Sequence, residues 1–347
     1  MDFGYLNSRY YLGFDDSNLR FMPIISVSHL SKHFQVFEKE PGLAGSIKSL
    51  FSRKYETKKA IDDISFEIKE GELIGFIGPN GAGKTTTLKC LSGLLYPTRG
   101  KISILGFNPY DRKPEFLKKI AFVMGQKNQL WWDLPAIDTF LLNKEIYEVD
   151  DEKYKTVIGE LTKLLEVEDI INLPVKKLSL GQRMRMEIMA SLIHSPQILF
   201  LDEPTIGLDV LMQKKLREFI REYNIRFKAT IILTSHYMQD VEQLCKRVII
   251  INFGKIIFDG QLSSLIEKYS PYKEIKVMFA QYADPKEIDK LGKIRTFEFP
   301  QLVLDVPNKK ANYTAASILK NFQVEDITIE DPQIEDVITK VYRENKK

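Results

Sequence analysis

The sequence of 347 residues lacks the features that assign a chain to the disulfide-rich, metal-binding or membrane-spanning classes. It has two cysteines, Cys90 and Cys245, with no CxxC pair and no histidine at a metal-ligand spacing, which favours a reduced, cytoplasmic compartment. A membrane-spanning helix needs about 20 apolar residues, whereas the longest apolar runs, at 198–201 and 248–252, have the length of strands. We therefore expect a protein that does not itself cross the membrane.

A secretory signal is also lacking, because residues 1–22 contain several acidic residues and tyrosines and no basic start followed by an apolar run. We interpret residues 1–22 as an N-terminal extension. Met22 directly precedes the first convincing strand, at 24–27, so Met1 and Met22 are alternative natural starts.

The sequence has no strong excess of either charge. Its 50 Lys and Arg residues are interleaved with 47 Asp and Glu residues, for a net charge of +3, which argues against a nucleic-acid partner. Hydrophobic residues at 44% and charged residues at 28% are ordinary values for a globular protein. A chain of this length predicts one large domain and a smaller one.

Strand-like runs rich in Ile, Val and Phe alternate with helix-length amphipathic segments over most of the chain. This alternation predicts an α/β domain at 23–269 with a largely parallel central sheet. Between about 127 and 190 the pattern becomes helical, which predicts a helical subdomain inserted into the α/β core. The expected strands of the core are at 24–27, 61–68, 73–77, 102–105, 120–124, 198–201, 230–234 and 248–253.

The pattern changes again near residue 270, where a serine is followed by Pro271. From there on the sequence predicts a small C-terminal α+β domain, 270–347. Its expected elements are short strands around 275–279, 296–299 and 302–306 and helices around 311–321 and 333–342.

Residues 78–85, Gly-Pro-Asn-Gly-Ala-Gly-Lys-Thr, have the pattern of a phosphate-binding loop between a predicted strand and a predicted helix. The glycines let backbone N–H groups converge on phosphate oxygens, and the helix N-terminus that follows favours an anion. Lys84 is expected to contact the β- and γ-phosphates, and Thr85 to offer its hydroxyl to Mg²⁺. The predicted nucleotide contacts of this segment are Gly78, Pro79, Asn80, Gly81, Ala82, Gly83, Lys84, Thr85 and Thr86.

Asp202 and Glu203 follow the apolar strand predicted at 198–201, at the edge where α/β sheets place ligand-facing groups. We expect Asp202 to hold Mg²⁺ through water, and Glu203 to polarise the water that attacks the γ-phosphate. Paired acids before a proline also occur at ordinary strand ends. The phosphate-binding loop favours the catalytic interpretation.

The segment at 178–182, Leu-Ser-Leu-Gly-Gln, resembles the LSGGQ signature of ABC ATPases. The resemblance covers about residues 24–267 and implies a P-loop NTPase (ABC ATPase) core whose ATP sites form between two chains. Leu180 stands where the pattern has its first glycine, which removes some backbone freedom. The residues expected to contact a nucleotide held by the second chain are Ser179, Gly181 and Gln182.

Other landmarks of the family follow in order. By resemblance, Gln126 touches Mg²⁺ and the attacking water and senses the permease, while His236 contacts the γ-phosphate. Asp209 is expected to couple the two sites from the second chain. Adenine is expected to stack on Phe34, with Tyr55 as the alternative, although a core aromatic is the simpler interpretation of each.

The resemblance also implies ATP and Mg²⁺ as cofactors, and integral-membrane permease subunits and a second ATPase subunit as partners. A homodimer is favoured over a heterodimer. The expected location is the cytoplasmic face of the cell membrane, where the protein is peripheral and held through the permease. Trp131 or Trp132 is expected to contact the permease, with simple packing in the core as the alternative. The basic insertion at 38–59 is either an amphipathic helix on a membrane surface or permease, or a solvated loop.

The Leu-for-Gly signature, the basic insertion and the residues at 327–336 resemble the ATPases of drug and antibiotic exporters that have separate permease subunits. We therefore expect an ATP-hydrolysing subunit of an exporter of drugs or other small amphiphiles. The alternatives are polysaccharide or lipid export and a soluble ABC ATPase without a transport role. A single cassette, with no long coiled coil and no zinc module, disfavours the regulators of translation and the DNA-repair ATPases.

Overall fold

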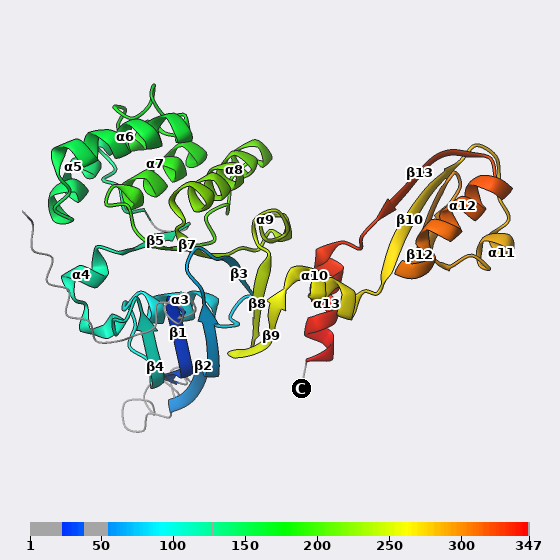
Figure 1. Ribbon diagram of the computed structural model, residues 1–347, viewed down its shortest axis with the longest axis horizontal. Helices are drawn as coiled ribbons and strands as arrows, with labels where there is room; N and C mark the ends of the chain where they lie inside the picture. The colour runs from blue at the N-terminus through cyan, green and yellow to red at the C-terminus, as the bar shows by residue number, and fades with distance from the viewer. Residues whose placement is uncertain (1–22, 38–54, 126–127, 346–347) are drawn as a thin grey trace, which may run out of the picture.

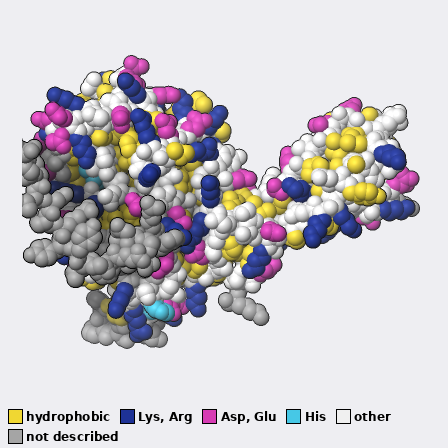
Figure 2. Space-filling model, in the orientation of Figure 1, with side chains coloured by type: hydrophobic (Ala, Val, Ile, Leu, Met, Phe, Trp, Pro, Cys, Tyr) yellow, Lys and Arg dark blue, Asp and Glu magenta, His cyan; other side chains and the backbone are white. Residues whose placement is uncertain are grey.

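The computed structural model describes residues 23–37, 55–125 and 128–345. The predicted N-terminal extension, Gln126 and residues 38–54 of the predicted basic insertion lie outside the described residues. The described residues form a large lobe and a small lobe that are joined at one side (Figure 1). Basic and acidic side chains are interleaved on the visible face of both lobes (Figure 2).

A six-stranded sheet forms the centre of the large lobe, in the order β5-β6-β7-β3-β8-β9. All neighbouring strands run parallel except β8 and β9. This confirms the predicted α/β core with a largely parallel sheet. The strands are β3 (Leu73–Ile77), β5 (Ile120–Met124), β6 (Ile198–Asp202), β7 (Thr230–Thr234), β8 (Arg247–Asn252) and β9 (Lys255–Gln261).

Both faces of this sheet are buried, which explains why its strands are nearly continuous apolar runs. Along β6, Leu199 and Leu201 belong to one hydrophobic cluster, and Ile198 and Phe200 to another on the opposite face. The first cluster includes the helical subdomain, and the second includes α3 (Lys84–Leu91) and an antiparallel sheet. Because packed layers enclose the sheet, the loops that leave its carboxyl ends start from fixed positions.

The antiparallel sheet has the order β2-β1-β4. Its strands β1 (Ile25–Phe37) and β2 (Tyr55–Ile68) are longer than predicted, and β4 (Arg99–Ile104) completes it. Residues 55–59, predicted as part of the basic insertion, are the start of β2 and pair with the end of β1. These five residues are therefore strand rather than amphipathic helix or loop, and threonine and tyrosine among them favour that conformation.

Helices flank the central sheet on both faces (Figure 1). Of the helices in the described part of the chain, none has both the length and the apolar character needed to span a bilayer. The flanking helices besides α3 are α4 (Pro114–Leu117), α8 (Val210–Phe227), α9 (Met238–Leu244) and α10 (Leu262–Tyr269).

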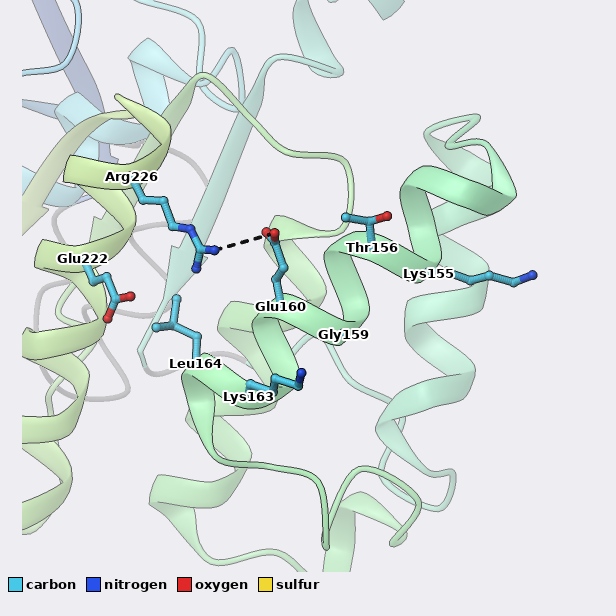
Figure 3. A pocket seen from close by; sticks show the side chains of 8 residues that line it. All are labelled: Lys155, Thr156, Gly159, Glu160, Lys163, Leu164, Glu222 and Arg226. Carbon is cyan, nitrogen blue, oxygen red and sulfur yellow. Dashed lines mark ion pairs between the residues drawn. The ribbon is translucent and has the colours of Figure 1, made fainter.

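The helical subdomain consists of α5 (Ala136–Ile146), α6 (Asp151–Leu165) and α7 (Leu180–Leu192), where the sequence predicts it. The Asp150 carboxylate caps α6, because it accepts a hydrogen bond of 2.8 Å from the Lys153 N–H. An open, charged groove separates α6 from α8, and Arg226 of α8 lies 3.7 Å from Glu160 of α6 across it (Figure 3). Across this groove the ion pair links the subdomain to α8, and α7 contacts strand β5 of the core directly.

The small lobe is an α+β unit with its own apolar cluster. Its antiparallel sheet has the order β11-β12-β10-β13. The strand β13 is absent from the predicted elements, because acidic residues interrupt its apolar pattern. The elements are β10 (Tyr272–Phe279), α11 (Pro285–Ile288), β11 (Lys293–Glu298), β12 (Gln301–Pro307), α12 (Ala311–Asn321) and β13 (Val324–Glu330).

The last helix, α13 (Ile334–Glu344), packs on the large lobe although we predicted it within the small domain. The spacing of its buried side chains places them on one helical face, and that face joins the large-lobe cluster beside Leu265 of α10. The small lobe is therefore inserted between α10 and α13. The buried side chains of α13 are Ile334, Val337, Ile338 and Val341.

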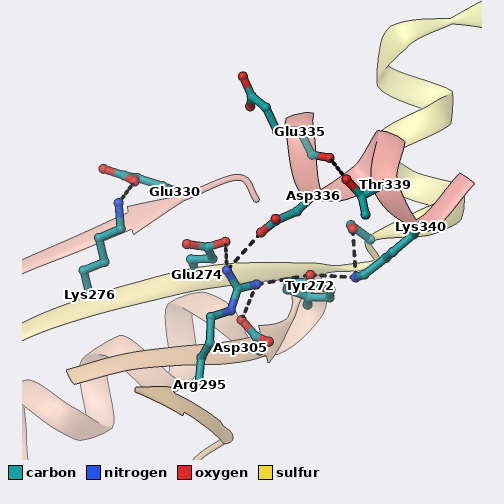
Figure 4. Close-up of polar contacts among 11 residues, drawn as sticks. Tyr272, Glu274, Lys276, Arg295, Asp305, Glu330, Glu335, Asp336, Thr339 and Lys340 are labelled. Atoms are coloured by element: carbon teal, nitrogen blue, oxygen red, sulfur yellow. Dashed lines mark hydrogen bonds and ion pairs between the residues drawn. The ribbon is translucent and has the colours of Figure 1, made fainter. Parts of the chain in front are cut away.

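Polar contacts join α13 to the strands of the small lobe (Figure 4). Arg295 of β11 donates a hydrogen bond of 2.6 Å to Glu274 of β10 and another of 3.3 Å to Asp336 of α13. Lys340 of α13 donates to the Tyr272 hydroxyl at 2.7 Å. These contacts hold the joint between the lobes.

Replacement of residues 275–329 by a two-residue turn between Glu274 and Glu330, which pair across β10 and β13, is expected to leave the large lobe folded. Truncation before Pro271 is expected to destabilise it, because each of the four buried side chains of α13 contributes about 2 kcal/mol. Urea unfolding followed by circular dichroism measures both effects. Equal unfolding midpoints for the two variants would contradict the packing of α13 on the large lobe.

Candidate functional site

The predicted phosphate-binding loop connects β3 to α3, and two of its glycines pack closely against neighbouring backbone. A Cβ atom at Gly78 would lie 2.3 Å from the carbonyl oxygen of Ile251, and one at Gly83 would lie 2.4 Å from that of Ala60. Gly83 also has a φ of 113°, which favours glycine. The loop can follow this path into the N-terminus of α3, where an anion is favoured, only with glycine at both positions.

Lys84, the first residue of α3, directs its ammonium group into this loop. The residue is 5% exposed, and its ammonium group donates to the carbonyl oxygens of Gly78 at 2.7 Å and Pro79 at 3.2 Å. Burial lowers the pKa of Lys84, and the negative charges of Glu203 and Asp202 act in the opposite direction. The cation therefore lies among the groups predicted to hold phosphates and near the predicted acidic pair.

Asp202 is the last residue of β6 and is 8% exposed. Its carboxylate accepts one hydrogen bond from the Thr85 hydroxyl at 2.8 Å and one from the Thr234 hydroxyl at 2.7 Å. Carboxylate and hydroxyl oxygens are the ligands that Mg²⁺ prefers. The donor set formed by Thr85 and Asp202 thus fits Mg²⁺, whereas the third predicted ligand, Gln126, lies outside the described residues.

Glu203 and His236 are in direct contact at the carboxyl ends of β6 and β7. The Nε2 atom of His236 lies 2.7 Å from a carboxylate oxygen of Glu203. The backbone N–H of Glu203 donates to the Thr234 carbonyl at 3.1 Å and to its hydroxyl at 3.0 Å. Glu203 has a φ of 56°, a costly conformation for a residue with a side chain, which these contacts maintain. The structure thus brings two of the three predicted catalytic residues together, and the third, Gln126, lies outside the described residues.

A cavity of about 350 Å³ lies over the phosphate-binding loop, and Asn80, Gly81 and Thr86 of that segment line it. Phe34 of β1, 37% exposed, lines the same cavity, and the Lys32 ammonium is 5.1 Å from the centre of its ring. Of the two predicted adenine-stacking residues, Phe34 is therefore the one beside the loop. Tyr55 lies at the start of β2, opposite Phe37, and is not among the described residues that line the cavity.

Ser179 and Gln182 form a capping box at the start of α7. The Gln182 N–H donates to the Ser179 hydroxyl at 3.2 Å, and the Ser179 N–H donates to the Gln182 side chain at 2.8 Å. Leu180 is the first residue of α7, where its backbone is helical. Because any residue adopts that conformation, the loss of backbone freedom expected from Leu180 has no effect on the fold of this segment.

The signature packs against the first turn of α8. A Cβ atom at Gly181 would lie 2.8 Å from the Met212 side chain, and the Asp209 carboxylate caps α8 by accepting from the Met212 N–H at 2.9 Å. The structure brings the signature and Asp209 together and separates them from the phosphate-binding loop. The described residues that line the cavity over the phosphate-binding loop do not include Ser179, Gly181, Gln182 or Asp209.

Glu187 of α7 holds the segment that follows the predicted Gln126. Its buried carboxylate accepts hydrogen bonds from the backbone N–H groups of Gln129, at 2.9 Å, and Leu130, at 3.2 Å. Burial raises the pKa of Glu187, and these two hydrogen bonds oppose that effect. The signature helix and the chain that leaves β5 are consequently one packed unit.

Trp131 and Trp132 are 51% and 50% exposed, so neither packs in the core. The Arg183 guanidinium, one turn into the signature helix, lies 5.5 Å from the centre of the Trp132 ring. The tryptophans therefore form an exposed surface beside the signature.

Two residues of the site, Thr234 and Glu187, were not predicted. The available signal for Thr234 is its position at the end of an apolar strand, as for Asp202. Nothing local marks Glu187, because its backbone partners lie 57 and 58 residues away in the sequence.

The model of the ABC transporter family matches residues 61–206. That of the EvrA-like ABC transporter C-terminal domain matches residues 271–330, which coincide with the small lobe without α13. The first match contains the phosphate-binding loop, the signature and the acidic pair.

The chain is similar to several ATP-binding proteins of transporters. It is 36% identical to the ABC transporter ATP-binding protein NatA of Bacillus subtilis, over 62% of this chain and 88% of that protein. It is 33% identical to the bacitracin transport ATP-binding protein BcrA of Bacillus licheniformis, over 65% and 72% respectively. It is 32% identical to the Nod factor export ATP-binding protein I of Rhizobium etli, over 69% of this chain and 74% of that protein.

Among solved structures, the chain is similar to the dimeric structure of a post-hydrolysis state of the ATP-binding cassette MJ0796 bound to ADP and Pi. The TM-score is 0.56 at 25% identity, and the match covers 69% of this chain and 98% of that one.

Replacement of Phe34 by alanine is expected to weaken ATP binding about tenfold, because stacking of a base on an aromatic ring is lost. Tyr55→Ala is the matched control and is expected to leave the affinity within about twofold. Titration calorimetry with ATP measures both constants. A larger loss for Tyr55→Ala than for Phe34→Ala would reverse the assignment.

Proposed function

The chain belongs to the ABC transporter family, and from this membership we propose that it is the ATP-hydrolysing subunit of an exporter whose permease is a separate polypeptide. One arrangement carries the proposal: Thr85 touches Asp202 and His236 touches Glu203, beside Lys84. These groups converge where the phosphate-binding loop and the carboxyl ends of β6 and β7 meet. Export itself is supported by the similarity to a Nod factor export ATP-binding protein.

The phosphate-binding loop and α3 bind the phosphates of ATP, with Lys84 as the cation for the β- and γ-phosphates. Thr85 and Asp202 would hold Mg²⁺, which when bound neutralises phosphate charge and polarises the γ-phosphate. Asp202, through its contact with Thr85, keeps the start of α3 at the correct distance from β6. Phe34, which lines the same cavity, supplies the stacking surface for adenine.

Glu203 orients and deprotonates the water that attacks the γ-phosphate, since it is the one acidic residue among the described residues that line the cavity. His236 contacts that carboxylate through Nε2 and thereby limits where it points. His236 is also proposed to contact the γ-phosphate, as the resemblance implies. Gln126, which follows β5, is proposed to complete this set.

The groups around the phosphate-binding loop are proposed to form one half of an ATP site, and a second chain supplies the other half. Ser179, Gly181, Gln182 and Asp209 lie in one region of the chain, away from the cavity that they are proposed to serve. A second chain, oriented head to tail, presents this region to the phosphates. The dimeric cassette to which the chain is similar supports this arrangement, and we propose a homodimer.

The permease is proposed to dock over a second cavity, of about 520 Å³, between the α/β core and the helical subdomain. Its floor includes Tyr147 stacked on His194, whose ring centres are 3.8 Å apart, and burial lowers the pKa of His194 to about 4. His194 is therefore uncharged at neutral pH. Gln129 lines the same cavity, and the exposed Trp131 and Trp132 follow it in the chain. Docking there places the subunit at the cytoplasmic face of the membrane, peripheral through the permease.

Drugs or other small amphiphiles are the proposed cargo, supported by the similarity to the bacitracin transport ATP-binding protein and by the Leu-for-Gly signature. Polysaccharide or lipid export is the second candidate. A soluble ABC ATPase without a transport role is the third, and the exposed tryptophans disfavour it. Stimulation of ATP hydrolysis by candidate cargoes, measured with the purified permease complex, separates the three.

Glu203→Gln is expected to retain ATP binding and to reduce hydrolysis at least about a hundredfold, because the amide cannot accept the proton of the attacking water. The variant is expected to remain a dimer with ATP bound, which size-exclusion chromatography with light scattering detects. Glu218→Gln, an exposed change on α8, is the control and is expected to hydrolyse ATP normally. Full hydrolysis by Glu203→Gln would show that another group is the base.

Alanine at both Trp131 and Trp132 is expected to reduce copurification with the permease about tenfold and to leave basal ATP hydrolysis unchanged, because interface tryptophans contribute strongly to binding. Tyr282→Ala, which removes an exposed aromatic of the small lobe, is the matched control. Unchanged permease association and transport in the double variant, with the fold intact, contradicts the proposed docking surface.

A further inference from the structure

A fully buried carboxylate outside the proposed catalytic set lies beneath the loops that carry Glu203 and His236. Asp240 of α9 is 0% exposed. One of its oxygens accepts from the Thr205 hydroxyl at 2.5 Å and from the Ser235 hydroxyl at 2.6 Å. The other accepts from the buried guanidinium of Arg217 at 2.8 Å. Each of these three partners of the carboxylate is therefore a donor, as a buried charge requires.

The two hydroxyl donors come from the segments on which hydrolysis is proposed to depend. Thr205 follows Glu203 by two residues, and Ser235 directly precedes His236. The Ser235 hydroxyl also accepts the Tyr237 N–H at 3.0 Å, so this serine fixes the backbone on both sides of the histidine. Asp240 thus joins two loops that belong to different strands.

Such a connection adds to the sheet, which holds only the first residues of these loops, where the Glu203 N–H donates to the Thr234 carbonyl and hydroxyl. The pairing of β6 with β7 ends at Asp202 and Thr234, one residue before Glu203 and two before His236. On the strand side, the hydrogen bond from the Thr234 hydroxyl to Asp202 fixes the separation of the chains. Beyond the ends of the strands, Asp240 fixes the separation of the two loops, because it accepts a hydrogen bond from each of them.

Arg217 connects the same carboxylate to α8, the helix that Asp209 caps. This guanidinium is buried and hydrogen-bonded to Asp240. The Arg217–Asp240 pair therefore holds both the segment 203–209, through Thr205, and the helix α8 that follows this segment. A shift of either loop would leave a buried donor or acceptor without its partner, which is costly.

We propose that Asp240 is a positioning residue for ATP hydrolysis, which holds the Glu203 and His236 loops so that their side chains remain in contact at 2.7 Å. This inference rests on the proposed role of Glu203. Asp240 is not among the described residues that line the cavity over the phosphate-binding loop, and it acts through Thr205 and Ser235.

Thr205→Val in the full chain removes one hydroxyl and leaves the buried charge pair intact. The expected result is about a tenfold fall in kcat with KM for ATP and ATP affinity unchanged, because misplacement of a catalytic group affects the transition state. Thr205→Ser keeps the hydroxyl and is expected to restore kcat. In the Glu203→Gln background, Thr205→Val is expected to cause no further loss, since it acts through Glu203.

Thr230→Val is the matched control, because Thr230 is buried at the opposite end of β7 and accepts the Gly71 N–H at 2.9 Å. It is expected to lower the melting temperature and to leave kcat unchanged. Ser235→Ala removes the other hydroxyl that donates to Asp240 and is the second test of the positioning role. If Thr205→Val does not fold, the kcat of Ser235→Ala alone decides whether Asp240 has this role.

A normal kcat in Thr205→Val or, if that variant does not fold, in Ser235→Ala overturns the positioning role. So does an equal loss from Thr205→Val in the wild-type and Glu203→Gln backgrounds. Full hydrolysis by Glu203→Gln alone overturns the proposed base, which is a different result from a normal kcat in the Thr205 variant.

Discussion

The carboxylate of Asp202 is the group on which the geometry of the nucleotide site depends. It is buried at the end of β6, and the hydroxyls of Thr85 and Thr234 donate to its two oxygens. A charge in that environment is costly unless donors surround it, so satisfying this one group brings α3 and the ends of two neighbouring strands together. The phosphate-binding loop, Glu203 and His236 take their relative positions from this contact and from the packed layers behind it.

Local pattern was sufficient to predict the parts of the site that are close together in the sequence. The phosphate-binding loop was predictable because its residues and their strand-loop-helix context are contiguous, and the acidic pair because it ends an apolar strand. What could not be predicted are contacts between distant segments. Thr234 meets Asp202 across 32 residues, and Glu187 meets Gln129 across 58. Such a pairing follows from strand order and helix packing, which periodicity does not encode.

The same limit explains the errors in the small lobe. The apolar spacing of α13 predicted a helix correctly, but it contains no information on which cluster that face joins. β13 has acidic residues on its exposed side and so few apolar positions that its pairing with β10 was not recognisable. Leu180 shows the reverse case. An unusual residue in the signature suggested a local change, whereas its position at the start of a helix accommodates it.

The return of α13 to the large lobe affects the order in which the protein can fold during synthesis. Domains generally fold as units as the chain emerges from the ribosome. Here the buried face of the large lobe that includes Leu265 is covered by residues that follow the whole small lobe in the sequence. The small lobe, with its own apolar cluster, can therefore fold first. Until α13 has been synthesised, the large lobe keeps an exposed apolar surface that chaperones can bind.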